Sequence, residues 1–168
     1  MASTKLWKTL TNVIVERLIT VRRGGRIEVV NPNGSVAARD MSTETLTATR
    51  QVLAKESGKT FILSSATEFV TTLPPAFLGA RYTFIVGAAP VSASYTVVTA
   101  SSANIIKGLQ NSVAGDAGDS GTADDTVTFV DGQAVAGDKV ELFSDGTSWF
   151  GYAISKVAAG ITFTQASA

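Results

Sequence analysis

The tripeptide Gly58-Lys59-Thr60 contains the residue types that close the phosphate-binding loop of many nucleotide hydrolases. That loop has the pattern G-x-x-x-x-G-K-[ST], in which backbone N–H groups hold phosphates at the start of a helix. Here Leu53 occupies the position of the first glycine, and only the short apolar run 61–63 follows Thr60. We therefore interpret the tripeptide as a turn followed by a strand over 60–63, and we expect no bound cofactor.

Aspartates are the next candidates for chemistry, because carboxylate oxygens are the ligands that calcium prefers. Four of them lie in the Gly-, Ala- and Ser-rich segment 111–125, which we interpret as a long loop: Asp116, Asp119, Asp124 and Asp125. Their spacing does not match the D-x-[DN]-x-[DN]-G calcium loop. We therefore interpret them as solvated loop carboxylates and predict no metal site.

Three further aspartates, Asp131, Asp138 and Asp145, each stand beside a glycine. This pairing is typical of turns, because Asp bonds its own backbone and Gly adopts positive φ. A catalytic carboxylate pair stays open as an alternative, because the sequence does not give the separation of the side chains.

The chain of 168 residues contains neither Cys nor His. Disulfides, thiolate metal sites, Ser-His-Asp and Cys-His catalysis and His-based zinc chemistry are therefore excluded. Only 17% of the residues are charged, below the average of about 25% for soluble domains. This composition favours β-structure in extensive contact with other chains, and we predict that the protein is not an enzyme and has no catalytic residues.

Charge is unevenly distributed along the chain. Residues 1–59 contain ten Lys or Arg against five Asp or Glu, whereas residues 60–168 contain four against nine. Either the two parts face different environments, or the basic residues form a solvated surface. We predict a partner-docking arm at the N-terminus, with a simple core helix as the alternative. Its candidate partner-binding residues are Lys5, Trp7, Leu10, Arg22, Arg23 and Arg26.

The N-terminal segment has two alternative structures. Apolar residues at helical spacing predict a short amphipathic helix over 4–21, but β-branched residues make a strand equally compatible with its second half. Gly24-Gly25 predicts a hairpin turn in the segment 19–30, and NPNG predicts a turn at 31–34.

Glu16 and Arg17 interrupt the apolar run, so we expect no signal peptide, no membrane contact and synthesis in the cytosol. Because no nucleic-acid motif is recognisable, we also expect no nucleic-acid partner.

The remainder of the chain predicts short strands separated by turns. Residues 41–53 are expected to be extended, and no helices of 10–15 residues lie between the later strands, as a parallel sheet would need. We therefore predict an all-β fold, an antiparallel β-sandwich or jelly-roll-like barrel, with an N-terminal extension. The predicted strands are 60–63, 69–73, 82–86, 95–99, 104–106, 126–130, 139–143, 148–154 and 161–164.

Alternation along the strand 148–154 places Trp149 on one face and Phe150 with Tyr152 on the other. Aromatic residues on both faces indicate that both faces are covered. One face belongs to the core. The other face contacts a second layer or a neighbouring subunit, or it forms a platform that binds a sugar, and we favour contact with a neighbouring subunit.

Two stretches together resemble the β-domain of virion proteins of tailed bacteriophages. They are ESGKTFILSSATEFVTTLPPAFLGARYTFIVGAAP and VTFVDGQAVAGDKVELFSDGTSWFGYAIS, and the resemblance covers about residues 56–154. It implies a capsid decoration (cement) protein, a homotrimer that binds the major capsid protein on the capsid surface after assembly in the host cytoplasm. The alternative is a head or tail fibre module that binds host-surface glycans. Residues 1–55 lie outside the resemblance, and we predict that they form a docking arm beside a β-domain over 56–168.

Overall fold

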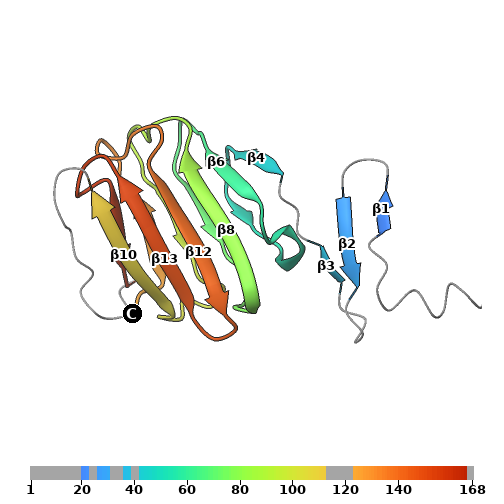
Figure 1. The fold of residues 1–168 in the computed structure, drawn as a ribbon. Coiled ribbons are helices and arrows are strands. Elements are labelled where there is room, and N and C mark those ends of the chain that lie inside the picture. Colours follow the sequence, from blue (N-terminus) through green and yellow to red (C-terminus); the bar gives the residue numbers. More distant parts are fainter. Residues whose placement is uncertain (1–19, 23–25, 31–35, 39–41, 113–122, 166–168) are drawn as a thin grey trace, which may run out of the picture. The chain divides into compact units, whose positions relative to one another are not determined.

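In a computed structural model of the chain, the described residues are 20–22, 26–30, 36–38, 42–112 and 123–165 (Figure 1). For the first three of these ranges, and for Ser112, the description is limited to the backbone. Two units are distinguished, Met1–Asp40 and Met41–Ala168.

The first unit contains a three-stranded antiparallel sheet of β1 (Thr20–Arg22), β2 (Arg26–Val30) and β3 (Val36–Ala38). The predicted hairpin between β1 and β2 is confirmed, since Arg22 pairs with Arg26 across it. Most of the predicted helix over 4–21 lies outside the described residues, as does the turn at 31–34. Residues 20 and 21 are strand, in agreement with the alternative for that part of the segment.

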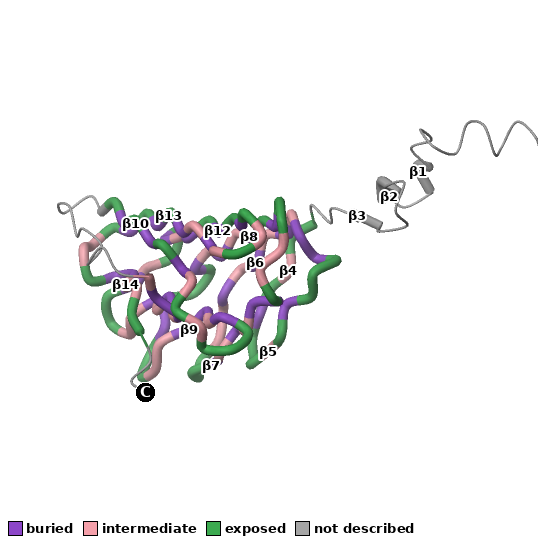
Figure 2. Tube along the Cα trace, turned by 90° about the horizontal axis from the view of Figure 1, so that it is seen from below, coloured by how far each residue is buried: buried purple, intermediate pink, exposed green. Residues whose placement is uncertain are grey.

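The second unit is a β-sandwich of two sheets around one hydrophobic core (Figure 2). The six-stranded sheet has the order β10 (Ile106–Ser112), β13 (Trp149–Ser155), β12 (Lys139–Asp145), β8 (Leu78–Val86), β6 (Thr60–Leu63) and β4 (Thr43–Leu46). The five-stranded sheet has the order β14 (Ile161–Thr164), β11 (Thr126–Phe129), β9 (Tyr95–Val98), β7 (Phe69–Thr72) and β5 (Arg50–Gln51). The all-β prediction is therefore confirmed.

Strand pairing is mixed, which differs from the predicted antiparallel arrangement. From β4 to β9 the chain alternates between the two sheets, so that β4, β6 and β8 pair in parallel in one sheet. In the other sheet β5, β7 and β9 also pair in parallel. Parallel neighbours need a crossover connection, and here a strand in the opposite layer makes that connection without a helix. The antiparallel pairs are those of β12 with β8 and β13, and of β11 with β9 and β14.

Because β4 and β5 are edge strands of the two sheets, the boundary between the units falls before residue 43. It therefore lies earlier in the chain than the predicted boundary at residue 55. The extended conformation predicted for residues 41–53 is confirmed for β4 and β5.

Alternating apolar residues of both sheets fill the core. Trp149, Tyr82 and Phe61 are among its largest side chains, and all three are almost completely buried. Trp149 points inward as the alternation predicted, in the burial pattern of β13. The remaining strand predictions agree with the structure to within a few residues except at β10, which was expected over 104–106 and runs over Ile106–Ser112 instead.

Candidate functional site

Gly58-Lys59-Thr60 forms a turn and the start of a strand, as predicted. Gly58 has φ of +99°, a conformation that favours glycine, and its N–H donates to the carbonyl oxygen of Arg81 at 2.7 Å. Thr60 begins β6, and a short 3-10 turn, η2 (Ala54–Glu56), precedes Gly58. A phosphate-binding loop would need a helix after Thr60, so this geometry excludes one.

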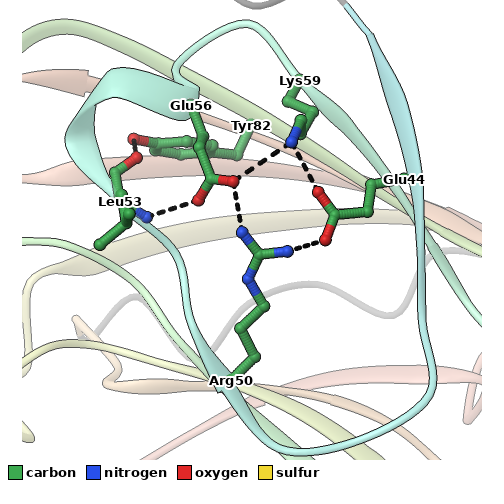
Figure 3. A network of polar contacts seen from close by, with 6 residues as sticks. All are labelled: Glu44, Arg50, Leu53, Glu56, Lys59 and Tyr82. Atoms are coloured by element: carbon green, nitrogen blue, oxygen red, sulfur yellow. Dashed lines mark hydrogen bonds and ion pairs between the residues drawn. The ribbon is translucent and has the colours of Figure 1, made fainter.

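Lys59 instead belongs to an ion network between the edge strands of the two sheets (Figure 3). Glu44 on β4 and Glu56 in η2 both bind the guanidinium of Arg50 on β5. The ammonium of Lys59 lies 2.6 Å from Oε2 of Glu44 and 3.2 Å from Oε1 of Glu56. Charged residues on edge strands that point inward discourage pairing with another sheet edge, and here they also join the two layers.

The network has little capacity for acid–base chemistry. Glu44 uses one oxygen for Arg50 and the other for Lys59, while Oε2 of Glu56 accepts the N–H of Leu53 at 2.8 Å. Burial by itself would raise the pKa of Glu56, but the hydrogen bonds from Leu53, Arg50 and Lys59 together hold that pKa below its usual value. Glu56 therefore stays ionised near neutral pH, with both oxygens in use, which indicates a structural role.

Tyr82 borders the same network and also stays in one protonation state. Burial, together with the negative charge of Glu56, raises the pKa of its phenol. The protonated hydroxyl donates to the carbonyl oxygen of Leu53 at 3.1 Å. A phenol that stays protonated at neutral pH offers no phenolate to accept a proton, so it does not serve as a general base there.

The predicted turn role is supported by side-chain hydrogen bonds for Asp138 and Asp145. Asp138 accepts the N–H of Val135 at 3.0 Å and that of Lys156 at 2.9 Å, so it connects two loops.

The interpretation of Asp124 and Asp125 as solvated carboxylates was wrong, because both residues are buried. Their backbones pair with neighbouring strand ends instead of extending into solvent, as in the exchange of two hydrogen bonds between Asp124 and Ile106. Asp116 and Asp119 lie outside the described residues.

Asp145 is expected to titrate well below an ordinary aspartate. Hydrogen bonds from Ser148 N–H, Thr147 N–H and the Thr147 hydroxyl lower its pKa from 3.8 to about 2. These bonds stabilise the folded state above pH 3.8, and their contribution is lost as pH falls through the folded pKa. Carboxyl chemical shifts measured by NMR should give a midpoint near 2. Thr147→Val removes the hydroxyl bond and should raise that midpoint, whereas an unchanged midpoint would contradict this account.

The structure brings together only part of the predicted docking residues. Arg22 and Arg26 are cross-strand partners in the β1–β2 hairpin. Lys5, Trp7, Leu10 and Arg23 lie outside the described residues, so their docking role stays a prediction.

The outer face of the six-stranded sheet carries an apolar surface that sequence reasoning identified only in part. Five of the seven exposed large hydrophobic side chains in the described part of the chain belong to its strands. Tyr152 is 45% exposed, Phe143 44% and Leu109 62%. Four of these five side chains lie together with the half-buried Phe150, and the fifth is Leu78 on β8. The name aromatic face is used below for the cluster of Leu109, Phe143, Phe150, Tyr152 and Ile154.

One row of the aromatic face is a closed stack. Cross-strand pairing aligns Lys107, Phe150, Phe143 and Arg81 in that order on four neighbouring strands. The two rings are 5.1 Å apart between centroids and nearly parallel, at 15°. The Arg81 guanidinium lies 5.8 Å from the Phe143 centroid, and the Lys107 ammonium lies 5.3 Å from the Phe150 centroid. Both ring faces of each Phe are thus occupied within the chain.

Alternation along β13 predicted that Phe150 and Tyr152 share a face opposite Trp149, and the burial pattern confirms this. It did not identify Phe143 or Leu109, whose place depends on how β12 and β10 pair with β13. A signal for Phe143 was available in the sequence of β12, where Lys139, Glu141 and Phe143 alternate with the apolar Val140 and Leu142.

Within the described ranges, no group of three or more acidic side chains is arranged to hold a metal ion. The same ranges contain no helix with the length and apolar character to cross a bilayer. Comparison of the chain with models of protein families and with curated proteins finds no match.

Proposed function

We propose that this chain is a structural protein of a tailed-phage virion, a decoration protein that binds the outer surface of the capsid as a homo-oligomer. The resemblance of residues 56–154 to virion β-domains suggests this role. The chain lacks His and Cys, which is compatible with a role that needs no catalysis. The resemblance implies a trimer, so we expect three copies in the oligomer.

The observation that carries the proposal is the aromatic face. A β-sheet that exposes Leu109, Phe143 and Tyr152 together offers a surface for protein contact, because large exposed apolar patches mark interaction sites. Contact between copies gives a homo-oligomer several equivalent attachment points on a symmetric shell, so individually weak capsid contacts add up to stable attachment.

The closed stack favours protein contact over the glycan-binding alternative. A sugar that stacks on an aromatic ring needs an open ring face, but Arg81 and Lys107 cover the outer sides of the Phe143–Phe150 pair. The ring edges of this pair, the exposed side chain of Tyr152 and the neighbouring aliphatic side chains remain for a partner, and these suit the apolar centre of a protein interface.

The test is to incubate the purified full-length protein with undecorated capsids and to image the particles by cryo-electron microscopy. Ordered extra density at three-fold or quasi-three-fold positions is the expected result. A variant that lacks residues 1–40 leaves both sheets of the sandwich intact, since β4 begins at Thr43. Loss of density with this variant would place docking in the arm, and retained density would place it in the sandwich. Bare capsids in both samples would overturn the proposal.

A further inference from the structure

The aromatic face carries charges of both signs among its apolar side chains. Three cations belong to it or border it: Lys107, Arg81 and Lys139. Two carboxylates lie on the same side of β12, Glu141 and Asp145, since residues two apart on a strand share a face. Lys139 and Glu141 are paired at 2.8 Å. This surface therefore has no large excess of either sign.

The row of cross-strand partners next to the Phe143–Phe150 row places a hydrogen-bond donor beside an acceptor. Tyr152 and Glu141 are direct cross-strand partners, flanked by Leu109 on one side and Thr83 on the other. Two such faces in contact would offer each other apolar side chains, a phenol O–H and a carboxylate. The whole chain has a formal net charge of +0, so copies do not repel each other over long distances.

We infer that the aromatic face is the contact between copies of this chain. A surface that recognises an unlike partner by charge presents an excess of one sign, whereas mixed charges on an apolar sheet complement a second surface of the same kind. The inference rests on the homo-oligomer part of the proposed function and gives it a location. Tyr152 and Phe143 are the central anchors, since aromatic side chains at the middle of an interface contribute most of its binding energy.

The test is sedimentation velocity and equilibrium on the full chain over a range of concentrations. Tyr152→Glu and Leu109→Glu each add a carboxylate to the aromatic face at an exposed position. Thr164→Glu adds the same charge to an exposed residue of the five-stranded sheet and serves as the matched control. Far-UV circular dichroism and thermal unfolding establish that each variant keeps the fold.

The wild type and Thr164→Glu are expected to sediment as the same oligomer. Both aromatic-face variants should be folded and should associate at least about thirty-fold more weakly, because Tyr152→Glu removes a central anchor and both variants bury an added carboxylate in the apolar contact. A wild type that stays monomeric, or variants that keep the wild-type mass, would overturn the inference.

Capsid imaging separates this inference from the proposed function. If the wild-type oligomer depends on the aromatic face but leaves capsids bare, the inference stands and the decoration role fails. If the variants keep their oligomeric mass and lose capsid binding, the face contacts the capsid and the inference fails. The measured mass also gives the number of copies, which tests the expected trimer.

Discussion

Replacing Glu56 with Gln is expected to lower the free energy of unfolding by about 2–4 kcal/mol, from the cost of breaking a buried ion pair with allowance for partial exposure of Arg50. The side chain of Glu56 is 9% exposed and that of Lys59 10%, so water replaces the lost carboxylate poorly. Within the network, Arg50 and Lys59 would then share one carboxylate, that of Glu44, in place of two. Urea unfolding followed by tryptophan fluorescence measures the change, because Trp149 lies in the core.

Glu141→Gln is the matched control, with the same substitution in a solvent-exposed ion pair. The side chains of Lys139 and Glu141 are 34% and 50% exposed, and exposed pairs contribute about 0–1 kcal/mol. The two variants should be compared at a concentration at which both have the same oligomeric mass. Equal losses of stability in the two variants would contradict a special role for the buried network.

Lowering the pH should reduce the difference between the wild type and Glu56→Gln. The folded-state pKa of Glu56 is lowered from 4.5, so its contribution to stability is present above pH 4.5 and is lost as pH falls through the folded pKa. The stability curves of the two proteins should therefore converge under acidic conditions. A difference that stays constant from neutral to acidic pH would contradict the assignment.

The ion network shows what the sequence alone does not determine. Glu44, Arg50, Glu56 and Lys59 are ordinary polar residues in the sequence. They meet because β4 and β5 belong to different sheets and because β4 pairs in parallel with β6, next to Lys59. The lack of helices of 10–15 residues between the later strands favours antiparallel pairing, so the sequence did not predict this register.

Local sequence patterns predicted much of the remaining fold. Alternation and glycine turns predicted β6 and β14 at their observed bounds, since β-branched and aromatic residues between two turns are typical of a strand. β10 was predicted too short because Lys107, Gly108 and Gln110 have low β-propensity and little apolar character. Its conformation depends on parallel pairing with β13 and on contacts across the sandwich. The conformation of such a segment depends on tertiary packing, which no local sequence pattern encodes.

A pair of glycines in the core explains part of this packing. Gly108 on β10 and Gly151 on β13 are cross-strand partners. The ring of Phe163 on β14 occupies the space above them, since a Cβ added at Gly108 would lie 2.3 Å from Cγ and Cδ1 of Phe163. At Gly151 the corresponding distance to Cε1 of Phe163 is 2.8 Å. The two sheets thus approach closely here because two residues have no side chain.

Gly108→Ala is therefore expected to destabilise the domain by about 1–3 kcal/mol, the usual cost of overpacking a core. The backbone of Gly108 lies outside the left-handed region, so a clash with Phe163 is the reason for the loss. Phe163→Ala removes that ring and should be destabilising by itself, through lost burial. Urea unfolding of both variants and of the double variant gives a complete cycle.

In the Phe163→Ala background the effect of Gly108→Ala should disappear or change sign. The added methyl group then enters the space left by the ring, and Ala restricts the unfolded chain more than Gly, a gain of about 0.4–1 kcal/mol. The two substitutions should therefore cost less together than the sum of their separate effects. Additive losses would show that Phe163 does not contact Gly108, and that β10 is held at this position by other contacts.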